Sequence, residues 1–426
     1  MGGKLATVAD EALVETLLKT TSDIDGDQMT AVGHQTSAEA KHRGAVPEVA
    51  RDTRTSSVAP GMEPLPGAAG HTAVAAGSAC VAKTIAAGGA LVLASASRQD
   101  IPHMCSKDFQ KDYETSLAKT REQVLGEGSE GKVVLALQRS TGQLFALKRL
   151  KQQMGERDMD VLQAVFRCPH PNLAHVLAII VSDKPMGLLY PYMDEDVDAY
   201  WRRHFKFLPV QEIVRIVHGT LSGVKHLHSI NRIHRDIKQS NVLLTFGASR
   251  RVCLSDFGWC RDFHSESDGT NMMTRDLVTV TYRAPEIFLG SRSYDTSIDL
   301  WSCGIMLLEL LRGAHFITDV RNPPLGYIEK LVGPINESSW PGCSKLPKWA
   351  CQRALIDVVP PKAWLAPFKG GRKDVDAEGE LLAFSMLTLP PRQRITAAQA
   401  IKTQFVLRLL AHELSLIHIS EPTRPY

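Results

Sequence analysis

The sequence predicts an α+β fold with two lobes: a small antiparallel β-sheet lobe with one helix, followed by a large, mainly helical lobe. Two observations support this prediction. Strand-like apolar runs separated by turn residues occupy residues 124–193, and apolar residues recur at helical spacing from Pro209 to about Leu410. A chain that forms its sheet first and its helices second is expected to leave a cleft between two lobes.

The elements before Pro209 can be placed in chain order. They are expected to be strands at residues 124–126, 132–138, 143–150 and 187–193, and a helix around 157–166. The segment Ser140-Thr141-Gly142 has the composition of a turn, so it should join the second strand to the third.

The two ends of the chain differ in composition from the middle. Residues 1–112 are rich in Ala, Gly, Ser, Thr and Pro and nearly lack aromatic residues, so we expect a mostly disordered extension. Its apolar stretch 72–96 contains Lys83 and is dominated by Ala and Gly, which argues against a membrane span. Residues 411–426 resemble translated sequencing-adapter sequence. The folded domain is therefore expected at residues 113–410.

Composition excludes several functions. The net charge of +3 over 426 residues is too small to indicate a nucleic acid or an anionic membrane as partner. The eight cysteines are scattered without a C-x-x-C pair, which indicates reduced thiols instead of disulfides or a zinc site. The N-terminus lacks the pattern of a signal peptide. We therefore expect a protein of the cytoplasm, the nucleus or both.

Three motifs in the second half of the chain carry chemistry. Residues 234–241 read His-Arg-Asp-Ile-Lys-Gln-Ser-Asn, and Asp256-Phe257-Gly258 and Ala284-Pro285-Glu286 follow in that order. Together they resemble the H-R-D-x-K-x-x-N, D-F-G and A-P-E motifs of protein kinases. The resemblance implies the two-lobed protein kinase fold and an ATP-dependent serine/threonine protein kinase.

The same resemblance implies a role for each polar residue of these motifs. Asp236 would orient the hydroxyl of the protein substrate and accept its proton, while Lys238 would steady the γ-phosphate. Asn241 and Asp256 would hold Mg²⁺ against the phosphates of ATP.

A glycine-rich segment forms the expected nucleotide site. Residues 126–133 fit G-x-G-x-x-G-x-V between two expected strands, where glycines let backbone amides approach phosphates closely. Lys148 would pair with the α- and β-phosphates, residues 190–193 form the gatekeeper and hinge, and Asp196 would lie near the ribose. The expected ATP-binding residues are Gly126, Glu127, Gly128, Ser129, Gly131, Val133, Ala146, Lys148, Tyr192, Met193 and Asp196.

Protein kinases pair this lysine with a helix glutamate, and here the partner is ambiguous. The pattern R-E-x-x-L-L resembles residues 157–162, which puts Asp158 in the place of the glutamate, one methylene shorter and close behind Lys148. Asp158 is therefore the expected catalytic partner, with Glu156 as the other candidate. Either acid could instead belong to a solvated helix face.

Further segments, within about residues 120–407, resemble the cyclin-dependent kinase family. They are residues 278–286, similar to V-x-T-x-W-Y-R-A-P-E, residues 299–304, similar to D-x-W-S-x-G, and the later landmarks 340–342 and 391–395. The resemblance implies that Asp299 braces the catalytic loop and that Arg394 pairs with Glu286, as buried structural ions.

This family resemblance also implies regulation and substrate choice. Thr274 stands at the activating phosphosite, which an upstream activating kinase would modify. Three arginines stand at the family's phosphate-receptor positions, namely Arg157, Arg235 and Arg261. Thr279 and Arg283 would contact the substrate, with Arg283 favouring Ser-Pro and Thr-Pro sites.

The sequence also departs from the family. Ser129 and Glu130 replace its inhibitory Thr-Tyr pair, and Gln239 replaces a proline. A cyclin-like activator is implied, but residues 153–156 include the poor helix former Gly155 where the family carries its cyclin-contacting motif. Two other functions stay open: a pseudokinase scaffold that binds without turnover, and a docking role for the N-terminal extension.

Overall fold

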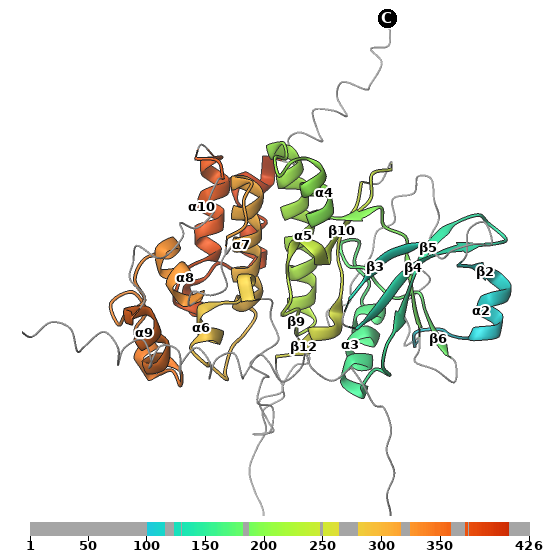
Figure 1. Ribbon diagram of the computed structural model, residues 1–426, viewed down its shortest axis with the longest axis horizontal. Helices are drawn as coiled ribbons and strands as arrows, with labels where there is room; N and C mark the ends of the chain where they lie inside the picture. Colours follow the sequence, from blue (N-terminus) through green and yellow to red (C-terminus); the bar gives the residue numbers. More distant parts are fainter. Residues whose placement is uncertain are drawn as a thin grey trace, which may run out of the picture. The chain divides into compact units, whose positions relative to one another are not determined.

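The computed structural model describes residues 100–115, 123–128, 130–181, 187–247, 250–263, 280–316, 324–358, 371–373 and 375–408 (Figure 1). The expected extension up to residue 99 and the tail 411–426 lie outside these ranges, and so do Ser129, Thr274 and Thr279. Expectations about them therefore stay predictions.

Within the described ranges, a seven-stranded sheet forms the first part of the fold. Its strands are β1 (His103–Cys105), β2 (Tyr113–Glu114), β3 (Val124–Glu127), β4 (Gly131–Gln138), β5 (Leu144–Leu150), β6 (Ala178–Val181) and β7 (Gly187–Pro191). Their order is β1-β6-β7-β5-β4-β2, with β3 also paired to β4, and all pairs are antiparallel except β1 with β6. The four strands expected from the sequence are confirmed to within two residues.

Two glycines fix the path of the β3–β5 region. Gly142 has a φ of +71°, which favours glycine, and its amide donates to the carbonyl of Gln138 at 2.8 Å to close the expected turn. At Gly131, an added Cβ would collide with the carbonyl oxygen of Arg149 on β5. The resulting register places Val133 opposite Lys148, so the glycine loop is held next to the lysine.

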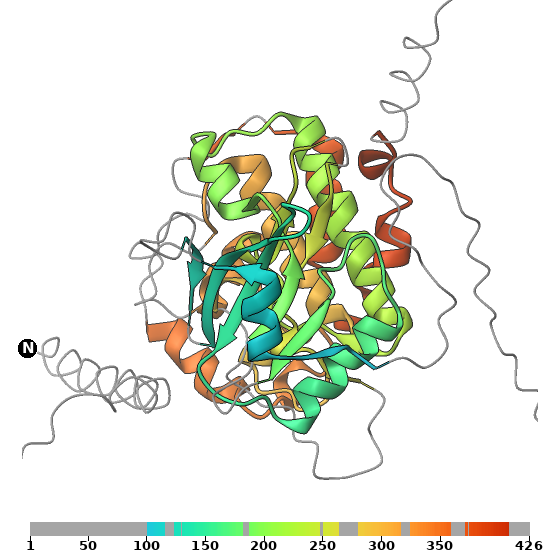
Figure 2. The ribbon, with the colours of Figure 1, turned by 90° about the vertical axis from the view of Figure 1, so that its right-hand side faces the viewer.

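The folded part begins earlier than the sequence predicted. Residues 106–112, assigned to a disordered extension, form helix α2 (Ser106–Asp112), and β1 precedes it. Phe109 of α2 stacks on Tyr113 with ring centroids 4.8 Å apart, and Tyr113 meets Phe145 of the sheet edge-on. In Figure 2, α2 is the cyan helix in front of the strands. These aromatic contacts bury apolar surface and so stabilise α2. The average composition of residues 1–112 does not reveal them.

A second helix, α3, accompanies the sheet, and it is the one that the sequence predicted for this lobe. Helix α3 (Glu156–Arg167) confirms the expected helix around 157–166. Its buried residues are Val161, Leu162 and Val165. They lie on one face because the first two precede Val165 by four and three residues, about one helical turn.

The rest of the chain is mainly helical, as expected. Its helices are α4 (Val197–Arg203), α5 (Val210–Ser229), α6 (Pro285–Phe288), α7 (Ser297–Arg312), α8 (Pro324–Val332), α9 (Trp349–Val358), α10 (Ala377–Met386) and α11 (Ala397–Ala400). Short strands and 3₁₀ turns between them are β8 (Glu195–Asp196), β9 (Arg232–Ile233), η2 (Gln239–Asn241), β10 (Val242–Leu244), β11 (Val252–Leu254), η3 (Phe257–Trp259), β12 (Arg261–Asp262), η4 (Val280–Tyr282), η5 (Cys343–Lys345) and η7 (Pro391–Gln393).

Helix α7 forms the centre of this part. Its residues are buried from Ser297 to Leu311, and α5 and α10 pack against it (Figure 1). A helix that is apolar on nearly all sides is expected to lie in a core. Among the described residues, no helix combines the length and the hydropathy needed to cross a bilayer.

Candidate active site

The 234–241 loop lies between β9 and β10 and is held by a buried acid of α7. Asp299 accepts hydrogen bonds from the backbone amides of His234 and Arg235, each at 2.9 Å, and its Oδ2 lies 2.9 Å from Nε2 of His228. Burial would raise the pKa of Asp299, but these partners, led by His228, hold it below its usual range. The expected brace between Asp299 and the loop is confirmed.

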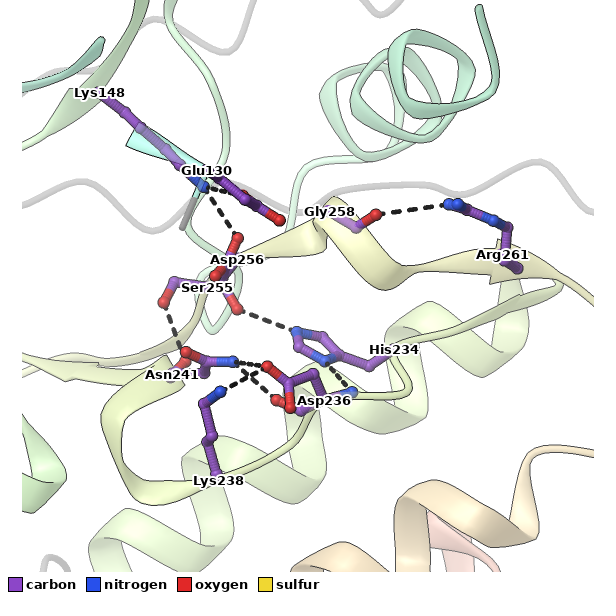
Figure 3. Close-up of polar contacts among 10 residues, drawn as sticks. All are labelled: Glu130, Lys148, His234, Asp236, Lys238, Asn241, Ser255, Asp256, Gly258 and Arg261. Carbon is purple, nitrogen blue, oxygen red and sulfur yellow. Dashed lines mark hydrogen bonds and ion pairs between the residues drawn. The ribbon is translucent and has the colours of Figure 1, made fainter. Parts of the chain in front are cut away.

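Two side chains orient the carboxylate of Asp236. Lys238 Nζ lies 2.7 Å from Oδ2, and Asn241 Nδ2 donates to the same oxygen at 2.9 Å and to the backbone carbonyl of Asp236 at 2.7 Å (Figure 3). Asp236 is only 3% exposed. Because these donors are charged or fixed by the loop, the carboxylate is held in one orientation.

Asp256 is brought to the same place by the residue before it. Ser255 donates to the carbonyl of Asn241 through its amide at 2.8 Å and through its hydroxyl at 2.9 Å. Asp256 then turns with a φ of +63°, and its Oδ1 lies 3.0 Å from Nζ of Lys148 (Figure 3). Hydrogen bonds and ion pairs thus connect Asp236, Asn241, Asp256 and Lys148, which the sequence predicted separately, into one site.

The charges of Lys148 and Asp256 reinforce each other. Burial would raise the pKa of Asp256, but the Lys148 ammonium lowers it below its usual range. Burial would lower the pKa of Lys148, but Asp256 and the neighbouring Tyr190 and Glu130 raise it. Both groups are therefore charged near neutral pH.

The structure does not contain the expected contact between Lys148 and Asp158, and the catalytic role of Asp158 stays a prediction. The lysine instead contacts Glu130 of the glycine loop, with Nζ 2.5 Å from Oε2. Asp158 pairs with Arg261 at 3.1 Å, and Glu156 is the exposed first residue of α3. Asp160, two residues further along α3, pairs with Arg232 at 2.8 Å, so Asp158 and Asp160 both contact arginines in this structure.

The other described residues that the sequence assigns to the nucleotide site lie on or beside β3, β4, β5, β7 and α4. Gly126 and Gly128 border open space, since a Cβ built on either would meet nothing within 4 Å in the described structure. Val133 and Ala146 lie on β4 and β5, while Glu127 ends β3. Tyr192 and Met193 follow β7 directly. Asp196 caps α4, accepting from the amide of Ala199 at 2.8 Å, which the sequence did not predict.

Two of the three expected phosphate-receptor arginines lie close together. Burial lowers the pKa of Arg235, and the charge of Arg261 lowers it further, while Tyr294 opposes the shift. Arg235 Nη1 also donates to the Tyr294 hydroxyl at 3.1 Å. Arg157 is exposed on α3. Arg283, an expected substrate contact, packs its guanidinium 5.3 Å from the ring centre of Phe288.

A buried polar cluster under the 234–241 loop was missed by the sequence reasoning. Gln239 Nε2 donates to Oε2 of Glu309 at 2.8 Å, and the Tyr282 hydroxyl donates to the same oxygen at 2.6 Å. Glu309 is fully buried in α7, so it needs such partners. The signal that could have revealed the cluster was Glu309, a single acid within the apolar residues 304–311 of α7. The cluster explains why Gln239 is suited to a position where the family carries a proline.

Comparison with known proteins identifies the family. The family model described as Protein kinase domain matches residues 119–406, more than half of the chain. The chain belongs to the protein kinase family. It is 32% identical over 294 residues to Cell division control protein 2 homolog 3 of Trypanosoma brucei brucei, covering 66% of this chain and 89% of the relative.

Two further relatives point the same way. Probable cyclin-dependent kinase 10 of Dictyostelium discoideum is 33% identical over 297 residues, covering 66% of this kinase and 76% of the relative. Cyclin-dependent kinase C-2 of Oryza sativa subsp. japonica is 29% identical over 304 residues, covering 66% of this kinase and 57% of the relative. This kinase is therefore a divergent relative of the cyclin-dependent kinases.

Protein kinase domains generally use ATP with Mg²⁺, and the residues present fit both. Asn241 and Asp256 offer the oxygen ligands that Mg²⁺ prefers. Within the described residues, no group of three or more His, Cys, Asp or Glu side chains converges on a possible metal position. Mg²⁺ usually takes several of its ligands from phosphates and water, so one amide and one carboxylate from the protein suit it.

Proposed function

We propose that this protein is an ATP-dependent serine/threonine protein kinase that acts on Ser-Pro and Thr-Pro sites. The observation that carries the proposal is the orientation of the Asp236 carboxylate by Lys238 and Asn241. A buried acid oriented in this way suits a group that positions a hydroxyl and takes its proton.

Each residue of the site then has a task. Asp236 binds the hydroxyl of the protein substrate and accepts its proton, and Lys238 places positive charge beside that carboxylate. Asn241 and Asp256 would hold Mg²⁺, while Lys148 and the glycine loop would hold the phosphates of ATP. When bound, ATP with Mg²⁺ supplies the γ-phosphoryl group for transfer.

Substrate class and activation extend this proposal. Its support is the similarity to relatives named as cyclin-dependent kinases. Arg283 and Thr279 would contact the residues around the target site, and Arg283 would favour a following proline. An upstream kinase would phosphorylate Thr274, and a cyclin-like protein is the candidate activator.

A pseudokinase scaffold is the second candidate, and one observation favours it. Lys148 is paired with Glu130 of the glycine loop instead of with an acid of α3. A scaffold would bind nucleotide or a partner without transferring phosphate.

A peptide assay on the full chain separates the two candidates. Radiolabelled ATP is offered with Mg²⁺ and three peptides that differ only at the target position or the next residue: Ser-Pro, Ser-Ala and Tyr-Pro. We expect transfer to Ser-Pro, weaker transfer to Ser-Ala and none to Tyr-Pro. Nucleotide binding without transfer to any peptide, or to a protein mixture, would support the scaffold instead.

We also propose that the protein works in a reducing compartment, the cytoplasm or the nucleus. Support comes from Cys105, Cys168, Cys253, Cys260, Cys303, Cys343 and Cys351, which are all free thiols in the described part of the chain. Imaging of a fluorescently tagged full chain would test this placement, and secretion into the medium would contradict it.

A further inference from the structure

The carboxylate of Glu130 in the glycine loop faces Lys148 at the centre of the site. Its Oε2 is 2.5 Å from Nζ of Lys148, which is also 3.0 Å from Oδ1 of Asp256 (Figure 3). The other oxygen of Glu130 lies against Gly258, where an added Cβ would collide with it. The Glu130 carboxylate is thus paired with the Lys148 ammonium, which is the group expected to bind the phosphates of ATP.

The backbone holds Glu130 in this position. Its carbonyl accepts from the amide of Lys151 at 2.9 Å, at the end of β5. The Gly128 amide donates to the Gly131 carbonyl at 2.9 Å, and Lys151 Nζ reaches the Gly128 carbonyl at 2.8 Å. The tip of the loop is therefore fastened to the strand that carries Lys148, and the Glu130 side chain is aimed inward by that closure.

We propose that Glu130 is an internal competitor of the nucleotide, a carboxylate that occupies the phosphate-binding side of Lys148 until ATP displaces it. The inference rests on the proposed function, because competition requires a nucleotide that uses Lys148. An approaching phosphate meets two carboxylates around one ammonium, and like charges at this range repel. Nucleotide binding must therefore break the contact between Glu130 and Lys148.

The size of the effect follows from exposure. The Glu130 side chain is 33% exposed, so water screens its pair with Lys148 and the contact can open without unfolding the loop. Losing one partly exposed ion pair as a competitor should strengthen nucleotide binding by about twofold to fivefold. Asp256 stays beside Lys148 in the absence of Glu130, so the ammonium keeps a partner and its position.

Calorimetry on the full chain tests this inference. The dissociation constant of a non-hydrolysable ATP analogue with Mg²⁺ is measured for wild type, Glu130→Gln and Glu130→Ala. Both variants should bind about twofold to fivefold more tightly than wild type. Glu114→Gln is the matched control, because Glu114 pairs with Arg139 at 2.8 Å on the same sheet away from the site. It should bind like wild type.

The outcomes separate this inference from the proposed function. Tighter binding by both Glu130 variants, including binding that appears only in them, supports the competitor. Equal or weaker binding by both overturns it while leaving ATP binding by the wild type, and thus the proposed function, intact. If neither wild type nor variants bind the analogue, the proposed function fails and the competitor fails with it. Thermal unfolding of each variant without nucleotide identifies a folding defect, in which case Glu130→Gln, the closer isostere, decides.

Discussion

Arg394 and Glu286 form a bidentate ion pair that is shielded from solvent, with Nη1 2.8 Å from Oε1 and Nη2 3.1 Å from Oε2. The guanidinium of Arg394 also stacks 5.1 Å from the ring centre of Trp301 on α7. This pair confirms an expectation from the sequence, and it ties the start of α6 to a segment more than a hundred residues later.

Arg394→Met should lower the free energy of unfolding by about 3–5 kcal/mol, because it leaves the Glu286 carboxylate buried without its cation. Urea denaturation measures the change. The matched control is Arg408→Met, whose pair with Asp376 is partly exposed, so it should cost about 1 kcal/mol or less. Equal losses in the two variants would contradict the account.

Stability should also fall as pH drops through the range set by His170. Burial, followed by the charges of His226 and Lys225, lowers the pKa of His170 to about 4. Its ring stacks on His226 at 4.7 Å, and its Nδ1 accepts from the amide of Asn172. In the unfolded chain its pKa is about 6.5. Between about pH 6.5 and 4 the unfolded state therefore binds more protons than the folded state, and the free energy of unfolding falls as the pH is lowered.

Urea unfolding at about pH 7 and about pH 5 measures this effect. The free energy of unfolding of His170→Gln should fall less between the two pH values than that of wild type, because glutamine cannot take up the proton. Parallel declines would show that other groups control the acid loss of stability.

Asp256→Asn should weaken Mg²⁺-dependent nucleotide binding by about tenfold or more, since it removes a charged ligand of the ion. Calorimetry with and without Mg²⁺ measures the change. The nucleotide affinity should fall only when Mg²⁺ is present. An unchanged affinity with Mg²⁺ would show that Asp256 is not a ligand of the ion.

Phosphorylation of Thr274 should raise activity by about tenfold, the value of one charge-assisted hydrogen bond of about 1.5 kcal/mol. Thr274→Ala should lose this gain, and Arg261→Ala should reduce it. Arg261 is paired with Asp158, so the phosphate has to replace that partner. Mass spectrometry of fully active protein checks the switch, and an unmodified Thr274 there would refute it.

The parts of the site that follow from the sequence are those fixed by short chain segments. Asp236, Lys238 and Asn241 lie within six residues of one another, so one loop conformation sets their mutual geometry. Asp299 and the Arg394–Glu286 pair followed from resemblance, because the surrounding motifs identify the partners.

The parts that did not follow depend on tertiary structure. The partner of Lys148 is decided by how the glycine loop closes, and no spacing along the chain encodes that closure. The contact of Asp158 with Arg261 did not follow because the sequence gives the separation of Asp158 from Lys148 along the chain but not the direction in which its side chain points. Helix α2 was missed because two aromatic side chains, Phe109 and Tyr113, outweigh the low hydrophobicity of the segment around them.

The most direct test of the account is the rate of peptide phosphorylation by Asp236→Asn at saturating ATP. Asparagine keeps the shape of the side chain but removes the carboxylate that accepts the proton, so we predict a loss of about 10²- to 10⁴-fold with nucleotide affinity nearly unchanged. Activity within about tenfold of wild type would contradict the role of Asp236 and with it the proposed mechanism.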